Sequence, residues 1–152
     1  MTNTQYETDY CVWAETNAKL LRQGQLAEVD IVHIIEELED VGKSERRSLQ
    51  SYMEIVLLHL LKWKYQPRLR SLSWRSSIEN GRQGLEKILD DSPSLRSTLP
   101  NVMDRAYVYA KRSAVAETGL SHSIFPTKCP FELTEVMNEV FLPHAEIEEL
   151  LP

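Results

Sequence analysis

Apolar residues recur at steps of three and four along most of this chain, with no strand-length stretch in which they alternate with polar residues. Steps of three and four place side chains on one face of an α-helix, whereas a step of two is typical of a β-strand. The pattern therefore predicts an all-α fold. Each amphipathic segment needs an apolar partner, which favours an up-down four-helix bundle followed by a short carboxy-terminal helix.

The helix boundaries are predicted from caps and helix breakers. Gly24 is placed to end the first helix, Asp30 to cap the second, and Ser71 or Ser73 to cap the third. The second helix is long, and we expect it to bend near Gly42. The predicted helices cover residues 6–21, 30–65, 71–89, 100–119 and 132–138.

Two packing features are expected within these helices. Gly81 and Gly84 lower the helix propensity of the third helix, so a close helix contact is the expected reason for their presence. The second helix carries an apolar stripe that is expected to face the core, made of Ile31, Ile34, Ile35, Leu38 and Val41.

Length and composition predict a single soluble domain over residues 1–143 with an acidic tail over 144–152. A chain of 152 residues with 42% hydrophobic and 26% charged residues is close to the globular average. Its longest apolar run, residues 55–58, is far short of a membrane span, and its amino terminus lacks a signal-peptide pattern. Cys11 and Cys129 have no metal-site spacing. We therefore expect a cytoplasmic protein with reduced thiols and no membrane association.

The charges are unevenly distributed. The formal net charge is −6, yet the segment 62–75 carries five cations, no acids and two of the three tryptophans. Segments 28–40 and 132–152 each carry six acids and neither lysine nor arginine. A general nucleic-acid-binding protein is usually basic overall, so nucleic acid is an unlikely partner for the whole chain.

The basic segment permits two interpretations. Its cations can bind phosphates while its aromatic rings stack on bases, with Lys62, Lys64, Arg68, Arg70 and Arg75 as the contact residues. Alternatively, Trp63 and Trp74 close the end of a helical core, with cationic side chains lying over the indole rings. The second interpretation is favoured, with Arg68 and Arg70 expected to point outward.

An ordered series of short motifs runs along most of the chain. The motifs are Tyr6, Asp9-Tyr10, Trp13, Leu20-Leu21-Arg22, Ile35-Glu36-Glu37-Leu38-Glu39-Asp40, His59-Leu60-Leu61-Lys62-Trp63, Ser73-Trp74-Arg75, Pro93-Ser94-Leu95, Glu117-Thr118 and Cys129-Pro130. Together they resemble the bacterial domain-of-unknown-function family twenty-nine over residues 6–143. The resemblance implies a compact all-helical fold without an established activity, ligand or catalytic residue.

Four residues are candidates for catalysis if the chain is an enzyme: Glu37, His59, Lys62 and Glu117. Glu117 falls on the core side of its predicted helix, where a charge needs a partner such as His59, Lys62 or Arg75. The pair Glu117 and His59 would serve as an acid and a base or as metal ligands, whereas a structural ion pair is the simpler interpretation.

Other chemistry is less well supported by the sequence. His33 and Glu36 have an i, i+3 ligand spacing, but a second such pair is missing, and the acidic cluster around Glu37 is more typical of a solvated helix face. The positive charge of Lys128 is expected to lower the pKa of the neighbouring Cys129 thiol somewhat, although a structural turn residue is the simpler interpretation of Cys129. No cofactor and no metal site are predicted.

The leading functional hypothesis is a non-catalytic cytoplasmic interaction or adaptor module that binds a protein partner or forms a homo-oligomer. The alternative is a metal- or phosphate-dependent hydrolase of nucleotides or nucleic acid. A third hypothesis is single-stranded nucleic-acid binding through the basic segment.

Overall fold

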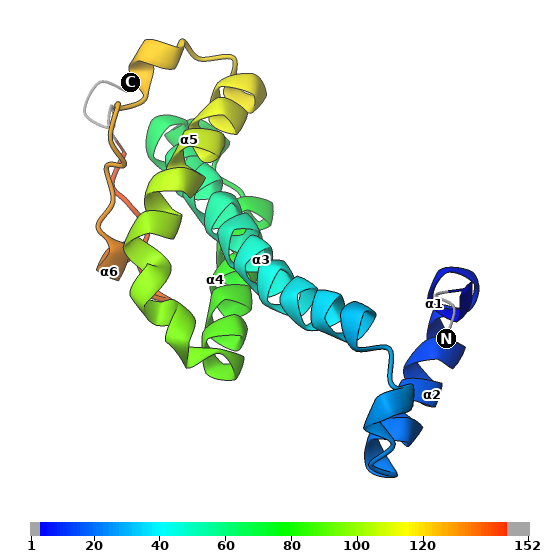
Figure 1. Cartoon of the computed structure of the whole chain (residues 1–152). Coiled ribbons are helices and arrows are strands. Elements are labelled where there is room, and N and C mark those ends of the chain that lie inside the picture. Colours follow the sequence, from blue (N-terminus) through cyan, green and yellow to red (C-terminus); the bar gives the residue numbers. More distant parts are fainter. Residues whose placement is uncertain (1–3, 146–152) are drawn as a thin grey trace. The chain divides into compact units, whose positions relative to one another are not determined.

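The structure, a computed structural model, describes residues 4–145 and is helical throughout its regular elements (Figure 1). The long helices are α2 (Tyr10–Arg22), α3 (Ile31–Tyr65), α4 (Leu72–Asp91) and α5 (Leu99–Thr118). The short helices α1 and α6 and four 3₁₀ helices connect or follow them. These short elements are α1 (Thr4–Thr8), η1 (Leu26–Glu28), η2 (Pro67–Leu69), η3 (Pro93–Thr98), η4 (His122–Ile124) and α6 (Leu133–Met137). The all-α prediction is confirmed.

The chain divides into two compact units, Met1–Ser44 and Glu45–Pro152, which we call the N-terminal unit and the second unit. Helix α3 begins in the N-terminal unit and ends in the second unit. The predicted first helix lies in the N-terminal unit as two pieces, because Asp9 ends α1 and caps α2 by accepting a hydrogen bond from the amide of Val12. The four-helix bundle and the single domain over residues 1–143 stay predictions.

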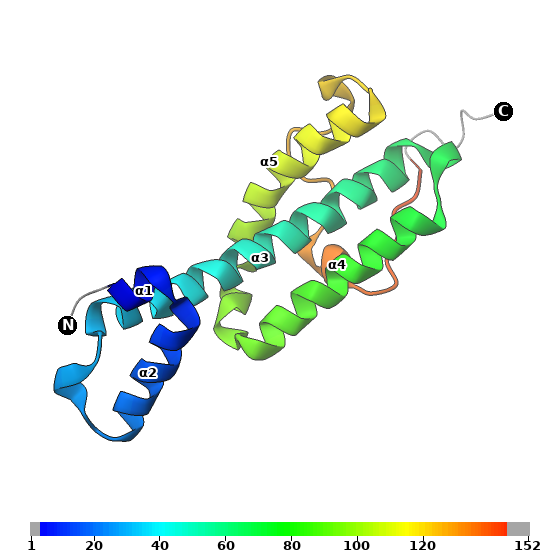
Figure 2. The ribbon, with the colours of Figure 1, turned by 90° about the vertical axis from the view of Figure 1, so that its right-hand side faces the viewer.

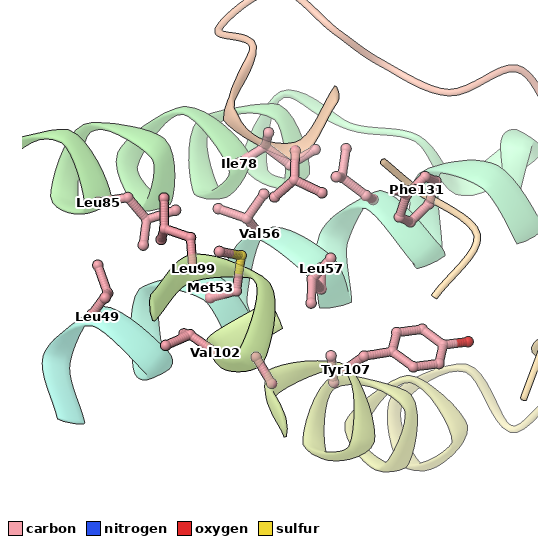
Figure 3. Close-up of a cluster of buried hydrophobic side chains, with 14 of the residues drawn as sticks. Leu49, Met53, Val56, Leu57, Ile78, Leu85, Leu99, Val102, Tyr107 and Phe131 are labelled. Atoms are coloured by element: carbon pink, nitrogen blue, oxygen red, sulfur yellow. The ribbon is translucent and has the colours of Figure 1, made fainter. Parts of the chain in front are cut away.

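The second unit is built on one apolar core. The second half of α3 lies between α4 and α5 in the view of Figure 2. Side chains from all three helices meet in the core shown in Figure 3, where Met53, Leu57, Ile78, Leu85 and Val102 are almost fully buried. Each such side chain contributes about 1.5–3 kcal/mol through burial. Phe131 and Val136, from α6 and the loop before it, complete the core.

Helix α4 packs closely on α3 at its two glycines, as predicted. A β-carbon on Gly81 would lie 2.6 Å from Cγ2 of Val56, and one on Gly84 would lie 2.6 Å from the ring of Tyr52. Ser71 caps this helix by accepting a hydrogen bond from the amide of Trp74. The close contact between α3 and α4 therefore depends on the absence of a side chain at Gly81 and Gly84 as well as on the apolar side chains that pack there.

The prediction that the apolar stripe of the second helix faces the core is wrong. Ile31, Ile35, Leu38 and Val41 are exposed and only Ile34 is half-buried, whereas the polar residue His33 of the same helix is buried in the N-terminal unit. The predicted acidic tail over 144–152 lies largely outside the described residues.

Candidate functional site

Helix α3 is anchored in the N-terminal unit by Glu37. The hydroxyl of Tyr6 donates to Oε1 of Glu37 at 2.6 Å, and the hydroxyl of Tyr10 donates to Oε2 of the same carboxylate. Tyr6 lies in α1 and Tyr10 is the first residue of α2. The two hydrogen bonds therefore connect these helices to a residue of α3 that is 31 and 27 positions later. Glu37, a predicted catalytic candidate, thus has both carboxylate oxygens engaged by phenols.

A second cluster lies one turn earlier on α3. The indole Nε1 of Trp13 donates to Oδ2 of Asp30 at 2.9 Å, and Nδ1 of His33 lies 2.7 Å from the same oxygen. The ring of His33 stacks on the ring of Tyr6, with 3.9 Å between centroids. The amide of Asp30 donates to Oδ1 of Asn17 at 2.8 Å. The helix cap, one histidine and two aromatic rings therefore form one connected group.

The ionisation of these groups follows from their hydrogen bonds. The bonds from Tyr10 and Tyr6 hold the pKa of Glu37 below its ordinary value. Burial would raise the pKa of Asp30, but the hydrogen bonds from Trp13 and His33 lower it overall. The hydrogen bond to Glu37 raises the pKa of Tyr6 to about 12 and also raises that of Tyr10. Near neutral pH, the carboxylates of Glu37 and Asp30 are therefore ionised, and the phenols of Tyr6 and Tyr10 are neutral.

This arrangement predicts how the N-terminal unit responds to pH. The carboxylates stabilise it above their ordinary pKa values, and this contribution is lost as the pH falls through their lowered values. The neutral phenol of Tyr6 contributes fully below its ordinary pKa of 10.0, and this contribution is lost as the pH rises through about 12. We expect ultraviolet titration of phenolate to show a late-ionising group that returns towards its ordinary pKa in Glu37→Gln. Glu39→Gln, which removes an exposed acid from the same helix, is the matched control, and identical titrations of the two variants would contradict the assignment.

The opposite side of α3 carries an apolar face. The side chains of Glu37 and His33 make their contacts inside the N-terminal unit. Successive helical residues are about 100° apart, so Ile35 projects from the opposite side of α3. We define the apolar face as the exposed residues Ile31 (49% exposed), Val32 (64%), Ile35 (49%) and Leu38 (68%). Exposed apolar residues at helical spacing are typical of a surface that is covered by a partner.

The apolar face has an acidic border. Glu36, Glu39 and Asp40 are exposed beside it, and none of the three forms an ion pair within residues 4–145. Their charge therefore remains available to a partner.

In the second unit, the structure brings together some of the predicted site residues. Nζ of Lys62 lies 3.4 Å from Oε1 of Glu117 and 4.7 Å from the ring centroid of Trp74. The side chain of Glu117 is 47% exposed, so it lies at the edge of the core rather than inside it. His59, one turn before Lys62 on α3, has Nδ1 2.8 Å from the carbonyl oxygen of Ile55. Of the partners expected for Glu117, the structure therefore places Lys62 against it. Glu37 belongs to the N-terminal unit.

The basic corner folds partly onto its own aromatic rings. Nε of Arg70 donates to the carbonyl oxygen of Trp63 at 2.8 Å, and its guanidinium lies 5.0 Å from the centroid of that indole. The expectation that Arg70 points outward is wrong, because the cation packs on the ring, whereas Arg68 and Arg75 are exposed. Lys64 is partly buried. Of the proposed anion-binding side chains, at least one is therefore committed to an internal contact.

The family described as Domain of unknown function DUF29 matches residues 5–142 of the chain, which include most of both units. The chain belongs to the DUF29 family. The resemblance found in the sequence is thereby confirmed, and the family's description carries no activity. No curated protein and no solved structure matched the chain.

Metal-type side-chain groups, membrane-length helices and the surroundings of Cys129 can also be described for this DUF29 chain. In residues 4–145, no three histidine, cysteine, aspartate or glutamate side chains are grouped as metal ligands, and no helix is both long and apolar enough to cross a membrane. Cys129 lines a cavity of about 540 Å³ together with Tyr107, Lys128 and Phe131. Burial raises the pKa of its thiol to about 11, opposite to the direction that a reactive cysteine needs.

Several residues of these clusters were not predicted as site residues. Asp30 was predicted only as a helix cap, and Trp13 was named only among the family motifs. For Asp30, the sequence signal is its i, i+3 spacing to His33 at the start of a helix, which places the two side chains beside one another. No local signal connects Trp13 to Asp30, which lies 17 residues later.

Proposed function

We propose that this DUF29 chain is a protein-interaction module and that the apolar face of α3 is its binding element. The observation that carries the proposal is the exposure of four apolar residues on one side of α3, while Trp13 and Val29 are the only buried hydrophobic residues among those described in the N-terminal unit. A unit with so small a core gains stability when a partner covers its apolar surface.

The acidic border indicates the chemistry of the partner. Glu36, Glu39 and Asp40 favour a helix whose apolar side is flanked by lysine or arginine. A second copy of the same face would bring acidic borders together, which is unfavourable. The proposed partner is therefore a basic amphipathic helix of another protein.

The anchoring cluster supports this role. Tyr6, Tyr10 and Glu37 fix the rotation of α3 about its axis from the inner side, and the rotation decides which residues face outward. A face that is held in its binding orientation loses less conformational entropy when the partner binds.

Two synthetic amphipathic peptides test the proposal. Both carry the same leucine face, one flanked by lysines and the other by glutamates, and binding is measured by titration calorimetry with the full chain. We expect the lysine peptide to bind at least about tenfold more tightly, by an amount that decreases with salt. The variant Ile35→Gln/Leu38→Gln should lose this binding. The matched control is Leu72→Gln, which removes a leucine that is 82% exposed in the second unit.

The outcomes separate the alternatives. Equal binding of the two peptides, or binding that survives in Ile35→Gln/Leu38→Gln, would contradict the proposal. Sedimentation velocity of the chain alone shows whether a second copy already occupies the face, since the same variant would then dissociate the oligomer.

A further inference from the structure

The connection between α3 and α4 in the second unit exposes two leucines. Leu69 is the last residue of η2 and is 60% exposed, and Leu72 is the first residue of α4 and is 82% exposed. Figure 2 shows that the two helices meet here at one end of the unit. Both leucines belong to the basic corner, which we define as residues 62–75. Their apolar surface is therefore in contact with water at a turn.

Two exposed cations lie beside these leucines. Arg68 directly precedes Leu69, and Arg75 lies one helical turn after Leu72 on the surface of α4. The basic corner itself contains no acid, and within the described chain neither arginine forms an ion pair. The corner therefore presents apolar side chains and positive charge on the same small surface.

Three acids from other segments come near this corner without cancelling its charge. Glu79 and Glu139 line a cavity of about 230 Å³ together with Arg75, but neither is within ion-pair distance of it. Glu117 contacts the corner through its ion pair with Lys62. The corner carries five cations, so its local charge stays positive against these three acids.

The two tryptophans of the corner are half-buried and covered by cations. The ammonium of Lys62 lies 4.7 Å from the ring centroid of Trp74, and the guanidinium of Arg70 lies 5.0 Å from that of Trp63. A ring face that is occupied by a cation is not open for stacking on a nucleic-acid base. Half-buried indoles beside cations and exposed leucines are instead typical of surfaces that meet the interface between membrane and water.

We propose that the basic corner binds the surface of an anionic lipid bilayer. Leu69 and Leu72 enter the boundary between headgroups and acyl chains, and Arg68 and Arg75 contact headgroup phosphates. A fluid bilayer accommodates an apolar group on a protruding turn, whereas a protein partner would need a hollow of matching shape. Two leucines and a few cations give reversible binding that depends on salt.

The charge of the remaining chain favours approach by this corner. Outside residues 62–75, the sequence has twelve cations against twenty-three acids, so an anionic surface repels most of the chain. The contact needs no membrane-spanning helix. It departs from the expectation of no membrane association, which rested on the absence of an apolar span, because the exposure of the two leucines is decided by the fold.

Lipid vesicles test this proposal with the full chain. One set contains phosphatidylcholine alone, the other contains phosphatidylcholine mixed with phosphatidylglycerol, and bound protein is measured by co-sedimentation. We expect at least about tenfold tighter binding to the mixed vesicles, and the difference should shrink as salt is added. Equal binding to the two sets, or no binding to either, would overturn the proposal.

Two double variants identify the contacts and leave the ring contacts of Lys62 and Arg70 in place. Leu69→Gln/Leu72→Gln should weaken binding to the mixed vesicles about tenfold, because the apolar insertion is lost. Arg68→Gln/Arg75→Gln should remove most of the preference for the mixed vesicles. Unchanged binding in either variant would contradict the assigned contacts.

Matched controls come from other surfaces of the chain. Val140→Gln removes a valine that is 80% exposed, and Arg96→Gln removes an exposed arginine, so both should bind the mixed vesicles like the unmodified chain. Ile35→Gln/Leu38→Gln should also keep vesicle binding, which separates this surface from the protein-binding face of α3. Loss of vesicle binding in that variant would overturn the proposal.

A single-stranded oligonucleotide distinguishes the bilayer from a soluble polyanion. If the corner recognised phosphates alone, the oligonucleotide would compete with the mixed vesicles, and Leu69→Gln/Leu72→Gln would bind it as well as the unmodified chain does. We expect no competition from the oligonucleotide at a phosphate concentration equal to that of the vesicles. Effective competition would overturn the proposal in favour of a nucleic-acid surface.

Discussion

Replacing Trp13 by alanine is expected to unfold the N-terminal unit while the second unit stays folded. Trp13 is 6% exposed, its ring lies 4.7 Å from that of Tyr6 between centroids, and its indole donates to Asp30. Removing a large buried aromatic side chain costs about 3–5 kcal/mol. A unit that buries only one other apolar side chain among its described residues has little stability with which to offset that loss.

Residue-resolved hydrogen exchange measures this result. Amides of α2 and the beginning of α3 should lose protection in Trp13→Ala, while those around Met53 and Leu57 keep theirs, because the second core contains no residue before Leu49. Trp13→Phe keeps a ring but removes the hydrogen bond to Asp30, so it should cost less. Simultaneous loss of protection in both units would show that they unfold together and would contradict the expected independence.

Replacing Arg82 by methionine should destabilise the second unit by about 3 kcal/mol, although a hydrophobic residue takes the place of a buried charge. The guanidinium donates to two carbonyl oxygens at the end of α6, and hydrogen bonds of charged groups contribute about 1.5–3 kcal/mol each. Methionine recovers part of this loss through its own apolar burial. The carbonyl oxygen of Val136 would lose its donor, whereas that of Glu135 would still accept from the amide of Asn138 at 3.2 Å.

Chemical denaturation measures the free energy of unfolding in this variant. Arg82→Lys keeps the positive charge, but an ammonium group lacks the planar N–H donors with which arginine binds both carbonyl oxygens. We therefore expect an intermediate loss of unfolding free energy. Arg96→Met, on an exposed arginine, is the matched control and should change stability by less than about 0.5 kcal/mol. A stability of Arg82→Met equal to that of the control would show that the end of α6 is held by its apolar contacts alone.

Much of the second unit could be predicted from the sequence. The periodicity located α4 and α5, and Gly119 ends α5 in the left-handed conformation that glycine adopts without strain. The close approach at Gly81 was also predicted, and Lys62 was one of the three partners expected for Glu117. These features are local or depend on one neighbouring helix, so the spacing of residues is enough to indicate them.

The sites were less predictable. Arg82 falls on the apolar side of α4, between Ile78 and Leu85, which is a sequence signal for a buried charge. Nothing local indicates that its partners are carbonyl oxygens more than fifty residues later. His59 was expected near Glu117. In the structure, Nδ1 of His59 is instead within hydrogen-bond distance of the carbonyl oxygen of Ile55, one turn earlier on the same helix.

The sequence by itself determined the helices of this DUF29 chain, because helix formation depends on periodicity, caps and breakers that lie within a few residues of each other. Only the tertiary structure decided which side of α3 faces inward. An apolar stripe is expected to turn towards a core, yet the two phenols on Glu37 and the indole on Asp30 fix the polar side inward in the N-terminal unit. Those contacts join residues 17 to 31 positions apart, and their hydrogen-bond geometry sets the rotation of α3.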